Sequence, residues 1–273
     1  MKTKLEKIIN APLIRIILGF VVIMTFMLTF KELLRIFENY GETKPWQFLL
    51  RASVNIGIYW LMFKMLEKRK VTEISLNKFH LNGLLSLIMG FTLISIVVLI
   101  LLLNGNYSIL SINKENKIMY IFIELFAASI FEEVLFRGII YRITEKSLNT
   151  IWAIIISSTL FSLVHITNSG FNITSFIVLM IGGAILGITY TLTQNLWSVI
   201  FIHLGWNLAQ GFFGFSISGK SFTCFINSKI IGPNWITGGE FGIENSYFTI
   251  ALLTVVFVLL IRKHQLKVAN NIS

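Results

Sequence analysis

The sequence predicts an all-α fold class, a polytopic membrane bundle of about eight transmembrane helices that forms one integral membrane domain over residues 1–273. Of the 273 residues, 55% are hydrophobic and only 13% are charged, whereas about 25% of residues are charged in an ordinary soluble domain. The mean hydropathy is +0.77. Apolar runs of about 20 residues, the length that crosses the hydrocarbon core of a bilayer, recur along the whole chain. These features exclude a typical soluble protein.

Eight apolar segments give the expected transmembrane helices. They lie at residues 11–30, 46–64, 81–103, 118–138, 151–168, 172–191, 194–214 and 247–262. The first apolar run continues past the roughly 7–15 residues of a signal-peptide core, so we expect it to be retained as a span. In the loop at 215–246, glycine and asparagine predict turns rather than a separate domain.

The distribution of basic residues predicts how the chain lies in the membrane. The formal net charge is +10, which in a soluble protein would indicate a nucleic-acid partner. Here the lysines and arginines flank apolar segments, so we expect them to contact the lipid bilayer and set the topology, with no nucleic acid involved. Fourteen fall on the side of the N-terminus and seven on the opposite side. This excess predicts a multi-pass protein of the cell membrane with both termini in the cytoplasm.

Charged residues inside the apolar segment 118–138 need an explanation. The stretch "FEEVLFRG" holds Glu132, Glu133 and Arg137, and burying a charge in a bilayer costs several kcal/mol unless it is paired. Glu133 and Arg137 are four residues apart, so on a helix they share one face and can form an ion pair. Glu132 is rotated from Glu133 by about 100° around the helix axis. It therefore needs a partner from another element.

Two downstream segments offer such partners. "FSLVHI" places His165 in the fifth apolar segment, and "FIHLGWN" places His203 and Asn207 four apart in the seventh. If these side chains converge with Glu132 in a wet intramembrane cavity, the glutamate can act as a general base and the others can stabilise an oxyanion. Glu132, His165 and His203 also match a zinc ligand set with an open position. Helix-packing hydrogen bonds, a structural ion pair and the ion ligands of a transporter remain alternatives.

The same residues carry a resemblance to a known family. "EEVLFR", "FSLVH" and "HLGWN" resemble the EExxxR, FxxxH and HxxxN/B series of the CPBP family, the CAAX proteases and bacteriocin-processing enzymes, also called the Abi family. The motifs occur in the family's order on separate apolar segments, and the resemblance covers residues 118–214. It implies an all-helical intramembrane endopeptidase whose partner is a membrane-associated protein or peptide. Members of the family cut prenylated CAAX proteins or take part in peptide processing and bacteriocin immunity.

The resemblance also implies a role for each motif residue. Glu132 would correspond to the glutamate that activates water, with Glu133 and Arg137 as its supporting pair. His165 and His203 would bind or polarise water, metal or substrate. The family is described both as metalloproteases and as metal-free, glutamate-dependent enzymes, so zinc and a metal-independent mechanism both stay open.

Asn207 would correspond to the residue that helps to hold the oxyanion. Two other readings of the same cavity remain: a non-proteolytic membrane scaffold or immunity protein that binds a partner there, and a proton-coupled transporter. Abundant lysine, asparagine and isoleucine favour an AT-rich bacterial genome. Because bacteria generally lack prenylation, a leader peptide, a peptide signal or a membrane-protein tail is the expected substrate.

The depths of the motif residues in their spans predict one further feature. At about 1.5 Å per residue, Glu132 and His203 would lie about 9 and 14 Å from the cytoplasmic ends of their spans, and His165 about 21 Å. A shared site therefore requires the fourth and fifth helices to extend into the cytoplasm. We expect Arg142, Glu145 and Lys146 on the projecting part.

Overall fold

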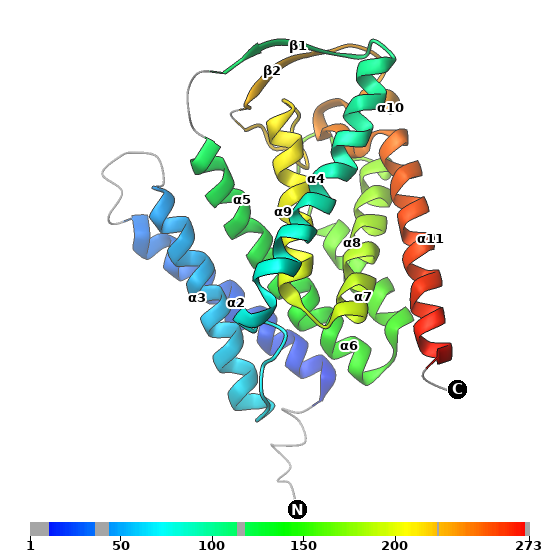
Figure 1. The fold of residues 1–273 in the computed structure, drawn as a ribbon. Coiled ribbons are helices and arrows are strands. Elements are labelled where there is room, and N and C mark those ends of the chain that lie inside the picture. The colour runs from blue at the N-terminus through cyan, green and yellow to red at the C-terminus, as the bar shows by residue number, and fades with distance from the viewer. Residues whose placement is uncertain (1–10, 36–43, 114–117, 223, 271–273) are drawn as a thin grey trace, which may run out of the picture.

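The structure, a computed structural model, describes residues 11–35, 44–113, 118–222 and 224–270 and forms a bundle of helices (Figure 1). The long helices are α2 (Pro12–Arg35), α3 (Pro45–Leu66), α4 (His80–Leu103), α5 (Ile118–Glu133), α7 (Thr150–Leu163), α8 (Ile173–Thr193), α9 (Leu196–Phe212) and α11 (Tyr247–Asn270). The chain of α5 continues without a break into η2 (Val134–Tyr141) and α6 (Arg142–Ser147). The all-α prediction is therefore confirmed.

Each of the eight expected segments is helical over most of its length. Within the described residues, four helices are long and apolar enough to cross a membrane, at Pro12–Leu34, Gly83–Leu103, Ile173–Thr193 and Tyr247–Asn270. The number of eight spans stays a prediction. The fifth segment ends earlier than expected, because α7 stops at Leu163 and His165 lies in the turn that follows.

Helix α9 lies at the centre of the bundle and packs closely against α4 (Figure 1). Two glycines allow this contact. A Cβ atom at Gly90 of α4 would come within 2.0 Å of the Ile202 carbonyl oxygen, and a Cβ at Gly205 of α9 would come within 2.1 Å of the Leu87 carbonyl oxygen. Small residues at both sides let the two backbones touch, as in many membrane helix pairs. The contact fixes the face of α9 that carries His203 and Asn207.

The segment η2 is a π-helix, and it begins directly after the two glutamates. All eight of its residues are buried. π-helical turns are rare and occur often at functional sites. Side chains satisfy its carbonyl oxygens: Ser157 donates to Phe136 at 3.0 Å, and Arg142 donates to Gly138 at 2.9 Å. The regular α-helix expected over 118–138 is thus correct only as far as Glu133.

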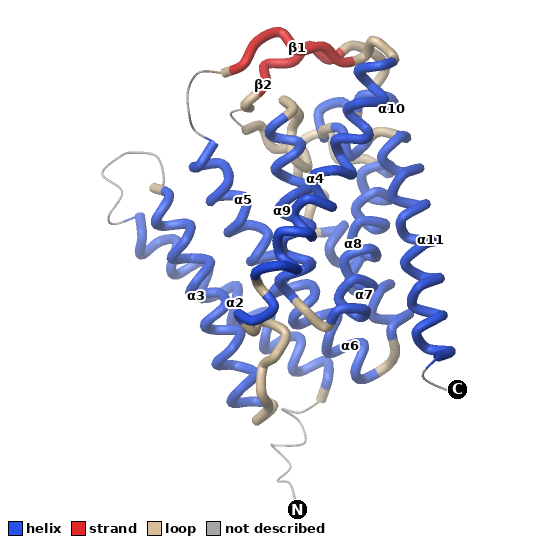
Figure 2. The backbone as a smooth tube through the Cα atoms, viewed as in Figure 1, coloured by secondary structure: helices blue, strands red, loops and turns tan. Residues whose placement is uncertain are grey.

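A two-stranded antiparallel ribbon lies at one end of the bundle (Figure 2). Strand β1 (Tyr107–Ile112) pairs with β2 (Ile226–Ile230), with Tyr107 opposite Ile230. The rest of the 215–246 loop forms tight turns, the short helix α10 (Asn234–Thr237) and the 3-10 turns Gly239–Phe241 and Ile243–Asn245. The prediction of turns holds for this part of the loop, and the ribbon is an addition that the loop's composition did not indicate.

The opposite end of the bundle holds the start of α2, the end of α11 and helix α6 (Figure 1). Helix α6 carries the residues predicted to project. The continuation of α5 through η2 and α6 agrees with the longer fourth helix that the depth argument requires. Arg142 donates to both carboxylate oxygens of Glu67, at 3.0 and 2.9 Å. Glu145 accepts hydrogen bonds from Thr150 at 3.0 Å and Thr191 at 2.5 Å. These two side chains are therefore packed against neighbouring elements, and the position of α6 relative to a membrane stays a prediction.

Candidate active site

The expected ion pair between Glu133 and Arg137 is present at the junction of α5 and η2. Arg137 donates to Glu133 Oε1 at 2.8 Å, and both side chains are 0% exposed. Arg137 also donates to the Gly183 carbonyl of α8 at 3.1 Å, and its guanidinium lies 4.7 Å from the centre of the Phe161 ring of α7. Removing one partner would leave a buried charge unpaired, which typically costs about 3–5 kcal/mol. The pair thus fixes the glutamate-bearing segment against α7 and α8.

His203 connects the two adjacent glutamates. Its Nδ1 lies 2.8 Å from Glu133 Oε1, and its Nε2 lies 3.8 Å from Glu132 Oε2. Glu133 Oε1 also accepts from Arg137, so it accepts here too, and His203 Nδ1 carries the hydrogen. The Nε2 edge is left facing Glu132. The group that faces Glu132 therefore comes from α9, 71 residues away in the sequence.

The two glutamates have different surroundings. Glu133 is fully buried and already bonded to Arg137 and His203, whereas the Glu132 side chain is 25% exposed. In the described part of the chain, Glu132 makes no hydrogen bond within the protein. Its carboxylate is thus the one of the two that remains open to water.

His165 approaches the same region from the end of α7. Its Nδ1 lies 2.8 Å from the Phe161 carbonyl oxygen, which can only accept, so the hydrogen sits on Nδ1 and Nε2 is left free. The His165 ring centre is 5.0 Å from that of Phe161, and the His203 ring centre is 6.0 Å from it. Both histidines therefore lie next to the same aromatic ring, and both are 8% exposed.

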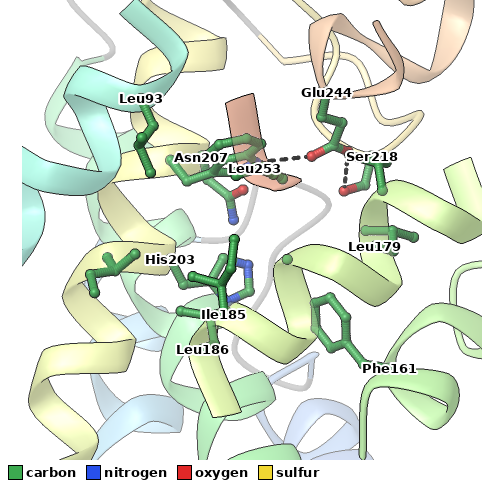
Figure 3. A pocket seen from close by; sticks show the side chains of 14 residues that line it. Leu93, Phe161, Leu179, Ile185, Leu186, His203, Asn207, Ser218, Glu244 and Leu253 are labelled. Carbon is green, nitrogen blue, oxygen red and sulfur yellow. Dashed lines mark hydrogen bonds between the residues drawn. The ribbon is translucent and has the colours of Figure 1, made fainter. Parts of the chain in front are cut away.

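A cavity of about 60 Å³ opens beside this cluster (Figure 3), which is room for a few water molecules. His203 and Asn207 line it from α9 and Phe161 lines it from α7, while apolar side chains of α4, α8 and α11 form the walls. Asn207 lies beside His203 with its amide directed into the cavity (Figure 3). Among the described residues, nothing hydrogen-bonds to the Asn207 side chain. The amide is therefore available to a ligand.

The structure adds residues that the sequence patterns missed. Glu244, from the turn Ile243–Asn245, lines the far end of the cavity and is only 3% exposed. Ser218 Oγ donates to it at 2.6 Å and Trp206 Nε1 at 3.0 Å. The sequence did hold a signal for Glu244. The chain has only thirteen acidic residues, all of them glutamates, so each one next to an apolar segment carries information.

The fit of the expected zinc ligand set is mixed. Both histidines have Nδ1 bonded to an oxygen acceptor and Nε2 free, which is the arrangement commonly seen around zinc-binding imidazoles. Within the described ranges, however, no three histidine, cysteine, aspartate or glutamate side chains gather closely enough to hold a metal ion. Glu132, His165 and His203 thus do not form a ligand cluster in this arrangement.

Comparison with known proteins places this cluster in a family. A family model described as Type II CAAX prenyl endopeptidase Rce1-like matches residues 114–209. This segment is therefore similar to the Rce1-like family. The match confirms the resemblance to the CAAX protease family and spans α5 to α9, including all six predicted site residues. The Rce1-like family implies a CAAX-type endopeptidase that acts on protein or peptide in a membrane, in agreement with the four apolar helices. No curated protein and no solved structure matches the chain.

Proposed function

We propose that this protein is an intramembrane endopeptidase that hydrolyses a peptide bond of a membrane-associated protein or peptide, with Glu132 activating the attacking water. The contact of His203 with both glutamates carries the proposal. Its Nδ1 is fixed by Glu133 at 2.8 Å, and its Nε2 faces Glu132 at 3.8 Å. A water between these two groups would be polarised by a carboxylate and oriented by an imidazole, which is the arrangement that hydrolysis requires.

In the first step, Glu132 removes a proton from this water as its oxygen attacks the carbonyl carbon of the scissile bond. The carbonyl oxygen becomes an oxyanion. Asn207 directs an amide into the cavity next to His203, so its Nδ2–H can donate to that oxyanion. In the second step, the protonated Glu132 gives its proton to the leaving nitrogen as the carbon–nitrogen bond breaks. Glu132 then returns to the carboxylate form.

Glu133 and Arg137 position the other groups. Because Glu133 accepts from both Arg137 and His203, it fixes the His203 tautomer and holds Nε2 toward Glu132. We propose that His165, whose Nε2 is free and whose ring lies beside the same Phe161 ring, binds the water or the substrate. We assign Glu133 and Arg137 as positioning residues.

We further propose that side chains alone carry the reaction. In this arrangement the three candidate zinc ligands do not cluster, whereas His203 Nε2 lies 3.8 Å from Glu132 Oε2, a separation that one bridging water would fit. Dialysis of the purified protein against EDTA should leave cleavage intact. Loss of cleavage that zinc restores would replace this part of the proposal with a metal-dependent mechanism.

The test of the function compares new peptide termini in cell membranes that contain the wild-type protein with those that contain Glu132→Gln, by mass spectrometry. The substitution keeps the size of the side chain and removes the base. Glu240→Gln is a matched control, because Glu240 is an exposed glutamate whose hydrogen bond to Ser169, at 2.9 Å, lies outside the cavity. Termini present with wild type and Glu240→Gln but absent with Glu132→Gln support the proposal and name the substrate. Identical termini in all three would favour the binding-scaffold reading.

A further inference from the structure

A buried carboxylate lies at the end of the cavity opposite to His203. Glu244 is 3% exposed and lines the cavity, in a turn directly before α11. In Figure 3, Asn207 lies between Glu244 and His203. None of the proposed catalytic steps uses Glu244.

The hydrogen-bond partners of Glu244 are all neutral. Ser218 Oγ donates to Oε1 at 2.6 Å, and Oε2 accepts from Trp206 Nε1 at 3.0 Å and from Gln210 Nε2 at 3.2 Å. In the part of the chain that the structure describes, no lysine, arginine or histidine forms an ion pair with it. A carboxylate has about four acceptor positions, so three neutral donors leave one position unfilled. A buried charge without an opposite charge is costly, and a cation that enters the cavity would remove this cost.

The walls between the two ends of the cavity are apolar. Leu179, Ile185 and Leu186 of α8 and Leu253 of α11 line it. At the Glu244 end of the cavity, a lysine or arginine side chain suits such walls, because its aliphatic stem packs against apolar residues while its charged end reaches a polar group. A small ammonium ion would gain the contact with the Glu244 carboxylate but would not pack against the apolar walls.

The spacing along α9 sets the distance between the two ends. His203 lies beside the water site, and Trp206 and Gln210, three and seven residues further on, hold Glu244. The midpoint of these two residues is about 7.5 Å along the helix axis from His203. An extended peptide advances about 3.3 Å per residue. A side chain at Glu244 would therefore belong to a residue about two positions from the bond beside His203.

We propose that Glu244 is a specificity-determining residue that binds a lysine or arginine side chain of the substrate, about two residues from the cleaved bond. The proposal rests on the endopeptidase function proposed above. It narrows the substrate to membrane-associated segments that carry a basic residue close to the cleavage site.

The experiment extends the comparison of peptide termini to Glu244→Gln, with Glu240→Gln as the matched control on the same loop. Wild type and Glu240→Gln should cut sites enriched in lysine or arginine two or three residues from the cleaved bond. Glu244→Gln should still cut but lose that enrichment. Enrichment that persists in Glu244→Gln, or that is absent in wild type, overturns the assignment of Glu244. Absence of wild-type-dependent termini overturns the endopeptidase function itself, and the two failures are thus distinguishable.

A second measurement does not depend on the folding of a Glu244 variant. Peptides that contain the best wild-type site are made with the basic residue intact or replaced by norleucine, which keeps the aliphatic stem and removes the charge. Wild-type protein in liposomes should cleave the norleucine peptide with kcat/KM lower by about tenfold or more, since a site built for a polar group rejects an analogue that lacks it. Equal values of kcat/KM would contradict the proposal even if Glu244→Gln fails to fold.

Discussion

At the scale of single residues, two adjacent glutamates differ because their surroundings differ. The i,i+4 spacing was sufficient to predict the pair of Glu133 with Arg137, since both residues lie on the continuous helical segment formed by α5 and η2. The contact of His203 with both glutamates joins residues about 70 positions apart. Helical spacing carries no information on such contacts. Only the position of His203 inside an apolar segment and the family resemblance pointed to them. Glu244 escaped prediction for the same reason, because its three donors come from α9 and a turn.

Replacement of Asn207 tests its proposed hydrogen bond to the oxyanion. Replacement by alanine removes the amide that faces the cavity beside His203. We expect kcat to fall by about 10²–10³ with a smaller change in KM, since the donor acts on charge that develops during the reaction. Steady-state cleavage of the identified peptide in liposomes measures both constants.

Asn227→Ala is the control for this measurement, because Asn227 is an exposed asparagine of β2 that bonds Ser111 on the outer ribbon. Its kinetic constants should match those of the wild type. A tenfold rise in KM with unchanged kcat in Asn207→Ala would instead assign Asn207 to substrate binding in the ground state.

At the scale of elements, hydropathy predicted where the helices lie but not their internal geometry. Apolar runs located all eight long segments, because a bilayer demands that each spanning backbone satisfy its own hydrogen bonds. The π-helix after Glu133 depends on donors from other elements, such as Ser157 and Arg142, so no local pattern encodes it. The ribbon likewise depends on pairing between strands that are more than 100 residues apart.

The contact of α4 with α9 predicts that alanine lowers the melting temperature at one glycine and not at another. Gly90→Ala should lower the melting temperature, because its Cβ would meet the Ile202 carbonyl at 2.0 Å and the two backbones would have to move apart. Gly57→Ala in α3 is the control, since no atom lies within 4 Å of its Cβ position and alanine favours a helix over glycine. Thermal unfolding in detergent measures both. Equal melting temperatures would show that α4 and α9 are not in backbone contact.

The loop after α3 makes stability depend on pH. Burial raises the pKa of Glu67, but hydrogen bonds from Arg142 and Arg69 outweigh it and hold the pKa below its usual value. Burial also raises the pKa of Glu73, but hydrogen bonds from Arg69 and from the Tyr59 hydroxyl outweigh it, so this pKa is lowered as well. A lowered folded-state pKa contributes stability above the unfolded pKa of about 4.3, and this contribution is lost as the pH falls through the folded value.

We therefore expect the melting temperature to fall as the pH is lowered below about 4.5, and to fall less in Glu67→Gln, which has no charge to lose. Melting curves between pH 7 and pH 3 measure the effect. A wild-type curve that stays flat over this range would contradict the ion-pair network at this end of the bundle.

At the scale of the whole molecule, the start of α2 and the end of α11 lie at the end opposite to the ribbon (Figure 1). This arrangement agrees with an even number of crossings, and the excess of basic residues predicts that this end faces the cytoplasm. The cavity, about 60 Å³ in volume, is too small for a peptide segment. The proposed function therefore requires this cavity to widen when a substrate enters.

The single cysteine gives a test of the orientation. Cys224 lies in the loop between α9 and α11, near the ribbon, so a membrane-impermeant maleimide should label it from outside intact cells. Burial raises the pKa of the Cys224 thiol, so labelling should be slow at pH 7 and faster at pH 8.5. In a Cys224→Ser background, Lys267→Cys at the end of α11 should react only after permeabilisation. The reverse pattern would place the termini outside the cytoplasm.

The cleavage rates of the purified protein and its variants test the proposed role of Glu132 most directly. Wild type, Glu132→Gln and Glu240→Gln, reconstituted in liposomes with the identified peptide, should share one melting temperature. Glu132→Gln should cleave at least about 10²-fold more slowly, because it lacks the general base. If folded Glu132→Gln cleaves within a few-fold of the wild-type rate, Glu132 does not activate the water and the proposed mechanism is wrong.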